Sequence, residues 1–172
     1  GLSHPHPQPF VLTTVHRAEN TDCRERFMGI WRGIELVSQT VPVIFPAHPR
    51  TKNLYPDIIR PLGDRLQIIE PVSYLTMLAM IRDASCIITD SGGVQKEAYL
   101  LKTPCVTVRD TTEWPETLAA GANMLVQPDP QKIQHAVKEM SSKSVSESDN
   151  PFGDGDASSH IAAFIRENVI RL

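Results

Sequence analysis

Residues 86–101 read Cys-Ile-Ile-Thr-Asp-Ser-Gly-Gly-Val-Gln-Lys-Glu-Ala-Tyr-Leu-Leu, and they contain the most informative pattern of the chain. The apolar run 86–89 predicts a buried strand, and residues 94–101 predict a helix. Between them stands the short turn Asp90-Ser91-Gly92-Gly93. A buried strand that passes through a glycine-containing turn into a helix is the repeating unit of parallel α/β sheets.

The same alternation of strand and helix extends to both sides of this stretch. Further strands are predicted at residues 10–15, 41–45, 66–69, 105–108 and 123–126. Further helices are predicted from Arg24 onward, capped by Asn20, Thr21 or Asp22, and at residues 54–60, 74–82, 116–120, 130–140 and 159–169. Because the strands are apolar throughout and alternate with helices, we expect a parallel sheet covered on both faces. This architecture is a doubly wound, Rossmann-like α/β domain.

The composition argues against several classes of protein. The 172 residues include 17 Lys and Arg against 20 Asp and Glu, a net charge of -3 that disfavours nucleic-acid and anionic-membrane binding. No apolar run approaches the roughly 20 residues of a membrane span, and the first residues lack a signal-peptide pattern. The three cysteines are widely spaced, which suits a reducing compartment, and Cys86 and Cys105 are expected in the core. We therefore expect a cytoplasmic protein with a linker or leader over residues 1–9 and one domain over residues 10–172.

Unusual polar residues follow the predicted strands, at the point where each strand ends. They are His16, Arg17 and Glu19 after the first strand, His48 after the second, Glu70 after the third, Asp90 and Ser91 after the fourth, and Arg109, Asp110 and Glu113 after the fifth. In parallel α/β sheets, ligands bind beyond the carboxyl ends of the strands. The distribution therefore predicts a polar ligand at this edge of the sheet.

The turn Asp90-Ser91-Gly92-Gly93 predicts a phosphate site. A helix start presents free N–H groups and a partial positive charge, and glycines allow a ligand to approach the backbone closely. Glu97, about one turn into the same helix, is a candidate acceptor for ribose hydroxyl groups. The residues leave an alternative equally open, in which Ser91 only caps the helix and the glycines only form a tight turn.

One of the six histidines is a candidate catalytic residue. His16 adjoins the charged residues Arg17 and Glu19, and a histidine is a usable acid or base near neutral pH. The alternative for His16 is a hydrogen-bonded loop residue, and His48 in its proline-rich turn is typical of a structural role. The remaining histidines are expected at the surface: His4, His6, His135 and His160. No metal site is predicted, because no second ligand recurs at metal-binding spacing.

Together these segments resemble the non-hydrolysing UDP-N-acetylglucosamine 2-epimerase family. The matching segments are His16-Arg17-Ala18-Glu19-Asn20, Pro46-Ala47-His48-Pro49, Ile69-Glu70-Pro71, and residues 90–97, 109–116 and 150–155. Their order and spacing cover almost the whole chain from Phe10 onward, and the combination is highly specific although each segment alone is not.

The resemblance implies that the chain is the C-terminal half of a two-domain, glycosyltransferase-B-like enzyme. The active site would lie in the cleft toward a missing N-terminal Rossmann-like domain. The family interconverts UDP-GlcNAc and UDP-ManNAc without a metal or a nicotinamide cofactor. It eliminates UDP to leave a 2-acetamidoglucal and adds UDP back after inversion at C2. The full-length enzyme is expected to be a homodimer, and this half alone is expected to be inactive, because the proton-transferring carboxylates belong to the missing domain.

The resemblance also implies roles for individual residues. The diphosphate would bind to Ser91, Gly92 and Gly93, and the ribose to Glu97. His16 matches the functionally important histidine near the leaving phosphate. Two further residues, Arg17 and His48, match positions that bind a second, regulatory UDP-GlcNAc in bacterial members.

Three positions depart from the family pattern. Ala18 stands where many members have a second arginine, Arg50 stands in place of an asparagine, and Trp114 replaces an arginine near the phosphates. Tryptophan cannot supply a bidentate charge, so we expect Arg109 to compensate and to contact UDP. Tryptophan also occurs at this position in relatives that act on UDP-2,3-diacetamido uronic acid sugars, and epimerisation of such a sugar is the alternative function. A glycosyltransferase half and a stand-alone nucleotide-binding domain without catalysis are the other two hypotheses.

Overall fold

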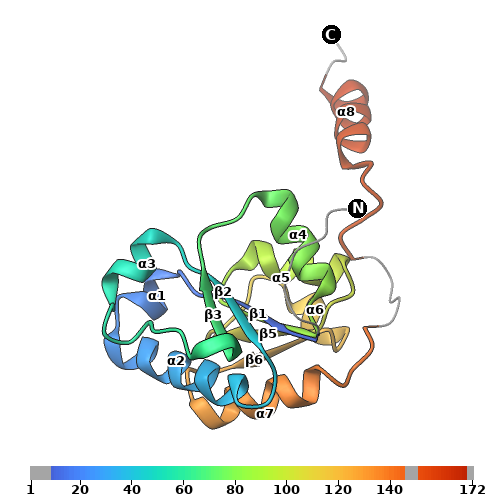
Figure 1. The fold of residues 1–172 in the computed structure, drawn as a ribbon. Coiled ribbons are helices and arrows are strands. Elements are labelled where there is room, and N and C mark those ends of the chain that lie inside the picture. Colours follow the sequence, from blue (N-terminus) through green and yellow to red (C-terminus); the bar gives the residue numbers. More distant parts are fainter. Residues whose placement is uncertain (1–8, 146–150, 170–172) are drawn as a thin grey trace.

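The computed structural model describes residues 9–145 and 151–169, and its centre is a six-stranded sheet in the order β3-β2-β1-β4-β5-β6 (Figure 1). The strands are β1 (Val11–Thr14), β2 (Val43–Pro46), β3 (Leu66–Ile69), β4 (Cys86–Thr89), β5 (Cys105–Val108) and β6 (Asn123–Val126). Every neighbouring pair is parallel. The doubly wound, Rossmann-like sheet predicted from the sequence is confirmed.

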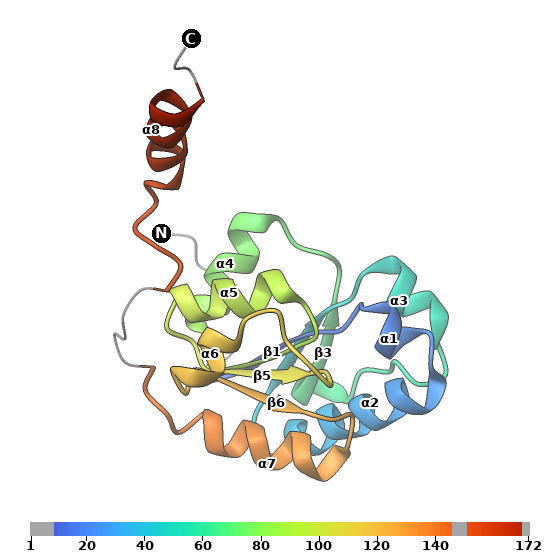
Figure 2. The same cartoon turned by 180° about the vertical axis from the view of Figure 1, so that it is seen from behind.

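Helices cover both faces of this sheet. They are α1 (Ala18–Thr21), α2 (Arg24–Ser38), α3 (Pro49–Leu54), α4 (Tyr74–Asp83), α5 (Gly92–Leu100), α6 (Pro115–Ala119), α7 (Pro130–Met140) and α8 (Ala157–Asn168), with a 3₁₀ turn, η1 (Gly63–Arg65), before β3. The helices α2 and α7 lie on one face, and α4 and α5 lie on the other (Figures 1 and 2). The sheet is therefore the middle of three layers.

Alternating strand residues divide the core into two clusters. Val11 packs with the α2 and α7 side, which includes Trp31, and its neighbour Leu12 packs with the α4 and α5 side. Cys86 lies in the first cluster and Cys105 in the second, and both thiols are free, so the prediction that they are core residues is confirmed. Burial raises the pKa of the Cys105 thiol to about 12, which keeps it unreactive near neutral pH.

Two local predictions are wrong. The helix predicted at residues 54–60 is instead α3, which spans Pro49–Leu54. A proline without an N–H suits the start of a helix, and the residue before a proline is driven out of the helical region, so Pro56 ends the helix before Tyr55. The predicted caps of α2 are also wrong, because two of them belong to α1 and the N-cap is Cys23, which has no side-chain capping bond.

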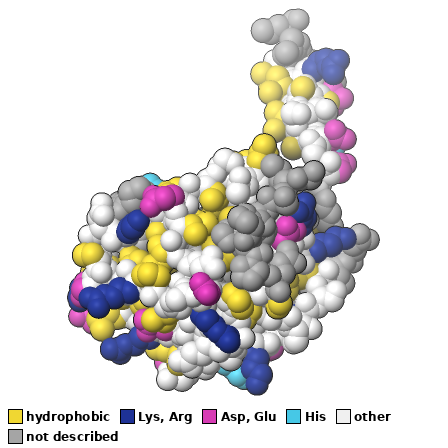
Figure 3. Space-filling view, in the orientation of Figure 1, with side chains coloured by type: hydrophobic (Ala, Val, Ile, Leu, Met, Phe, Trp, Pro, Cys, Tyr) yellow, Lys and Arg dark blue, Asp and Glu magenta, His cyan; other side chains and the backbone are white. Residues whose placement is uncertain are grey.

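The last helix, α8, projects away from the sheet (Figure 2). Its apolar residues lie on one side, as Figure 3 shows, and they are exposed, with Phe164 at 65% and Ile161 at 60%. Among the described residues, no helix combines the length and apolar content that a bilayer crossing requires. Most of the predicted leader 1–9 lies outside the described residues, as does Asn150 of the last matching segment.

Candidate functional site

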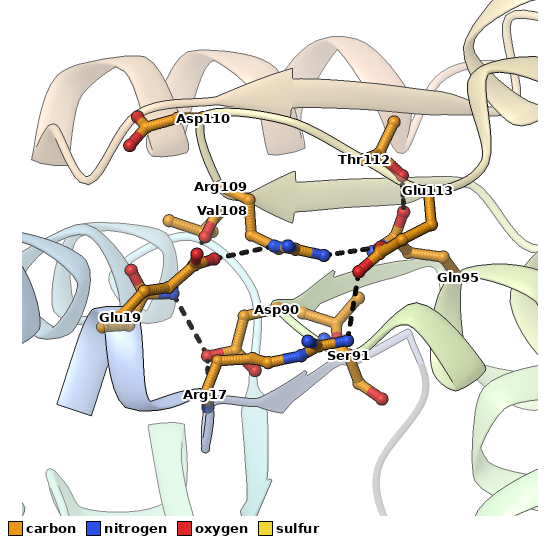
Figure 4. Close-up of polar contacts among 12 residues, drawn as sticks. Arg17, Glu19, Asp90, Ser91, Gln95, Val108, Arg109, Asp110, Thr112 and Glu113 are labelled. Atoms are coloured by element: carbon orange, nitrogen blue, oxygen red, sulfur yellow. Dashed lines mark hydrogen bonds and ion pairs between the residues drawn. The ribbon is translucent and has the colours of Figure 1, made fainter.

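The predicted polar residues meet at the carboxyl edge of the sheet, between β1 and β4. The strand order reverses between these two strands, and such a switch point leaves a crevice for ligands in doubly wound sheets. Three segments contribute: residues 16–20 after β1, which run into α1, and the loops of residues 90–91 after β4 and 109–114 after β5 (Figure 4). The third loop is held to α5 by a hydrogen bond of 2.6 Å from Thr112 Oγ1 to Gln95 Oε1.

Asp90 joins the first two loops. Its side chain is completely buried and accepts hydrogen bonds from the backbone amides of His16, at 3.1 Å, and Arg17, at 2.9 Å. The Asn20 side-chain amide donates to the same carboxylate at 3.1 Å, and His16 Nδ1 lies 3.2 Å from Asp90 Oδ1. Asp90 therefore holds the backbone of His16 and Arg17 next to the end of β4.

The start of α5 carries the predicted phosphate-binding residues. Ser91 is the N-cap, and its hydroxyl accepts a bond from the Val94 amide, so the capping role is confirmed. The tight-turn alternative for the glycines is wrong: Gly92 and Gly93 are the first helical residues, and neither has a positive φ. First-turn amides have no intrahelical acceptor, and the helix dipole adds partial positive charge there. The geometry suits an anion.

The two glycines differ in what surrounds them. A Cβ on Gly92 would lie 3.3 Å from Trp114 Nε1, 3.4 Å from Glu113 Oε2 and 3.5 Å from an Arg17 guanidinium nitrogen. A Cβ on Gly93 would meet nothing closer than Ser91 Oγ at 3.8 Å, and Gly93 is exposed. Close packing thus explains why residue 92 is a glycine, whereas the space beside Gly93 is open.

Four charged residues form a chain across this edge, visible as dashed contacts in Figure 4. The Arg17 guanidinium lies 3.4 Å from Glu113 Oε1. The Arg109 guanidinium donates to Glu113 Oε2 at 2.6 Å and to Glu19 Oε1 at 2.7 Å. The hydrogen bond to Glu113 raises the pKa of Arg109, and the same bond lowers the pKa of Glu113. Arg109 is 8% exposed and held from both sides, whereas the Arg17 side chain is 42% exposed. Arg17 is therefore the arginine free to turn toward a ligand.

Trp114 stands in an aromatic cluster beside these charges. Its ring lies 5.6 Å from that of Phe152 in an edge-to-face arrangement, and Phe152 also meets Tyr99 at 5.3 Å. The Lys96 ammonium lies 4.3 Å from the centre of the Trp114 ring. The buried indole N–H of Trp114 has no hydrogen-bond acceptor among the described residues. Phe152, in the segment leading to α8, therefore packs against side chains of α5.

The remaining predicted residues lie on α5 and on the loop after β2. Glu97 is four positions after Gly93, so the two residues share one face of α5. His48 is exposed on the loop after β2, and its carbonyl accepts the Lys52 amide at 3.0 Å. Hydrogen bonds and close packing thus connect His16, Arg17, Gly92 and Arg109 through Asp90 and Glu113. Ser91 follows Asp90 in the chain, while no described contact joins Glu97 to this group. Among residues 9–145 and 151–169, no three His, Cys, Asp or Glu side chains are grouped to hold a metal ion.

A family model matches almost the whole chain. The model described as UDP-N-acetylglucosamine 2-epimerase matches residues 2–166. The chain belongs to this family. The resemblance drawn from the sequence segments is confirmed.

Relatives in the 2-epimerase family match this chain over part of their own length. The UDP-2,3-diacetamido-2,3-dideoxy-D-glucuronate 2-epimerase of Pseudomonas aeruginosa is 41% identical over 159 residues, which are 91% of this chain and 44% of the relative. The UDP-N-acetylglucosamine 2-epimerase of Methanocaldococcus jannaschii is 42% identical with the same coverage. The crystal structure of a M. jannaschii UDP-GlcNAc 2-epimerase in complex with UDP-GlcNAc and UDP matches with a TM-score of 0.84, covering 92% of this chain and 45% of that one. The chain therefore spans less than half the length of these relatives.

Three contacts in this 2-epimerase-family chain were not predicted from the sequence. The bond between Asp90 and His16 joins residues 74 positions apart, and the Arg17–Glu113 pair joins residues 96 positions apart. The packing of Phe152 against Trp114 likewise depends on the tertiary fold. The only available signal was that most of these residues follow strands that end at the same edge.

Proposed function

We propose that this chain is the nucleotide-holding half of a UDP-sugar 2-epimerase that interconverts UDP-GlcNAc and UDP-ManNAc. One observation carries the proposal: the start of α5 offers free amides at the switch point of the sheet, and its Gly93 has open space where a ligand can approach. His16 and Arg17 stand beside it on the neighbouring loop. The names of the relatives supply the ligand class, a UDP-sugar.

In this proposal the diphosphate binds to the first turn of α5. The amides of Gly92 and Gly93 donate to its oxygens, and the helix dipole favours its negative charge. Arg17 exchanges its exposed contact with Glu113 for the diphosphate. Arg109 stays paired with Glu19 and Glu113, so the proposal gives the UDP contact expected of Arg109 to Arg17 and leaves Arg109 the role of holding Glu113. The indole N–H of Trp114 is a further donor near Gly92, although it cannot replace the charge of an arginine.

Glu97 binds the ribose in this arrangement. A carboxylate accepts hydrogen bonds from vicinal hydroxyl groups, and Glu97 lies one helical turn beyond Gly93 on the same face of α5. Its side chain is partly exposed. The nucleoside would therefore extend along α5 away from the diphosphate.

The proposed reaction breaks the bond between the sugar C1 and the diphosphate oxygen, and the bond electrons leave with UDP. A carboxylate of the missing half removes the proton from C2, which leaves the 2-acetamidoglucal. Interactions with UDP that strengthen as its charge develops lower the barrier, and the α5 amides, Arg17 and His16 are placed for that role. A proton then adds to the opposite face of C2 while the UDP oxygen bonds C1 again, which inverts C2 and completes the epimerisation.

The projecting helix α8 is an argument that the longer protein contains a second domain. Its exposed apolar side would be covered by the N-terminal domain that precedes this chain in a longer protein, which agrees with coverage of 44% of the relatives. The complete enzyme is proposed to act as a cytoplasmic homodimer. Residues 10–172 would then form its C-terminal domain, and the isolated chain would bind UDP weakly without turnover.

Calorimetric titration of UDP into the chain tests the proposal. We expect weak binding that Glu97→Ala reduces at least about tenfold, which corresponds to roughly 1.4 kcal/mol. Glu35→Ala on α2, a helix of the far face, is the matched control and should leave the affinity unchanged. Equal affinity in the wild type and Glu97→Ala would remove Glu97 from the site, and absence of UDP binding would refute the proposed function.

A second candidate substrate is a UDP-2,3-diacetamido uronic acid sugar. The P. aeruginosa relative named for this substrate is 41% identical to the chain, and Trp114 occupies the position at which the sequence departs from the usual arginine. The longer protein that includes the preceding half should be offered both UDP-sugars. If the uronic acid sugar is epimerised faster, it replaces UDP-GlcNAc as the proposed substrate. Transfer of the sugar to an acceptor, without epimerisation, would indicate a glycosyltransferase.

A further inference from the structure

We propose that Asp90 is a positioning residue that sets the tautomer of His16, so that Nδ1 always carries a hydrogen and Nε2 is the atom that faces the ligand. The assignment of the tautomer stands on the geometry of this chain. Its consequence for catalysis rests on the proposed function.

The Asp90 carboxylate meets four donors: the His16 and Arg17 amides, Asn20 Nδ2 and His16 Nδ1. Asp90 is 0% exposed, so no water competes for its oxygens. An ionised carboxylate only accepts hydrogen bonds. Nδ1 of His16 must therefore be the donor at 3.2 Å, which leaves Nε2 as the nitrogen that gains or loses a proton.

The orientation of the ring follows from the same contacts. The backbone of His16 and its ring bind to one carboxylate, so both ends of the side chain are fixed relative to β4. Asn20 supports this arrangement because its amide donates both to Asp90 and, at 3.0 Å, to the Val108 carbonyl. Half of the His16 side chain is exposed, so the part of the ring away from Asp90 is accessible to a ligand.

Asp90 also joins His16 to the phosphate-binding helix, because the next residue, Ser91, is the N-cap of α5. When Nε2 donates to the oxygen of the departing diphosphate, the imidazolium remains bonded through Nδ1 to a buried negative charge. Such a carboxylate stabilises the imidazolium without taking its proton. His16 and the α5 amides would therefore act on the same leaving group from a fixed relative position.

The substitution Asp90→Asn should switch His16 to the other neutral tautomer. The asparagine oxygen can still accept from the Arg17 amide and Asn20, and its NH₂ group then faces His16 Nδ1. Nδ1 becomes an acceptor, and the hydrogen of the neutral ring moves to Nε2. Asp110→Asn is the matched control, because Asp110 follows β5 and contacts Arg26 instead of His16.

The test is nitrogen NMR of the chain labelled with ¹⁵N-histidine, with the His16 signals assigned by their loss in His16→Gln. We expect a protonated Nδ1 in the neutral ring of the wild type and of Asp110→Asn, and a protonated Nε2 in Asp90→Asn. A wild-type ring protonated at Nε2, or an unchanged tautomer in folded Asp90→Asn, overturns the proposal. The wild-type spectrum alone decides the tautomer if Asp90→Asn does not fold.

Activity of the longer protein gives the second readout. Asp90→Asn should lower kcat by about 100-fold or more, with KM changed by less than about threefold, because the wrong tautomer affects the transition state more than substrate binding. Equal kcat in Asp90→Asn and wild type would overturn the catalytic consequence. UDP titration of the chain tests the proposed function separately, so a failure there is distinguishable from a failure of the tautomer assignment.

Discussion

Replacing Gly93 by alanine should make the chain more stable and a weaker binder of UDP. Gly93 is helical, does not have a positive φ, and its added Cβ would meet its nearest neighbour at 3.8 Å, an ordinary van der Waals distance. Glycine is unfavourable in helices, so the substitution should raise stability by about 0.4–1 kcal/mol. For a chain of this size, that corresponds to an increase in Tm of about 1–4 °C.

The same methyl group would occupy the space through which the diphosphate reaches the first-turn amides. We expect UDP affinity to fall at least about tenfold, or roughly 1.4 kcal/mol. Calorimetry measures both quantities, as the unfolding temperature without ligand and as the heat of UDP titration. Gln131→Ala on the exposed surface of α7 is the control, and its UDP affinity should equal that of the wild type. A more stable Gly93→Ala chain with unchanged UDP affinity would refute the placement of the diphosphate on α5.

Three further substitutions test the packing and the charges. Gly29→Ala should lower the free energy of unfolding in urea by about 1–3 kcal/mol, since its Cβ would overlap the backbone carbonyl oxygen of Pro128. Wild-type stability of this variant would contradict the structure there. Arg109 lowers the pKa of Glu113, so ionised Glu113 stabilises the fold above its ordinary pKa of 4.5, and this contribution is lost as the pH falls through the lower folded-state value. Glu113→Gln should therefore lose less stability than the wild type as the pH falls below 4.5 in urea unfolding, and parallel curves would argue against the ion pair. Phe152→Ala should shift the fluorescence of Trp114 and cost about 1 kcal/mol, with an unchanged spectrum counting against the aromatic cluster.

The sequence predicted all six strands because each is a short apolar run, and buried parallel strands require such runs. Helix boundaries were less predictable where two signals compete. At α3, the apolar residues after position 54 favoured a helix, but Pro56 prevents Tyr55 from continuing it. At α5, the glycines looked like a turn, although helix-compatible φ values let Gly92 and Gly93 begin the helix.

The candidate site was predictable as a set of residues and unpredictable as a set of contacts. Strand ends identify which loops share an edge, so His16, Ser91 and Arg109 could be grouped from the sequence. Hydrogen-bond partners depend on strand order and side-chain reach. The pairing of His16 with Asp90 therefore became visible only once β1 lay beside β4 in the sheet.

The exposed apolar side of α8 has a practical consequence for work with this chain in solution. Side chains such as Phe164 offer a contact for a second copy, so its sedimentation should depend on protein concentration and respond to mild detergent. Ending the chain after residue 156 removes this helix but keeps Phe152 on its aromatic partners. The shortened chain is accordingly the better sample for titration and NMR, because self-association would otherwise add its own heat and line broadening.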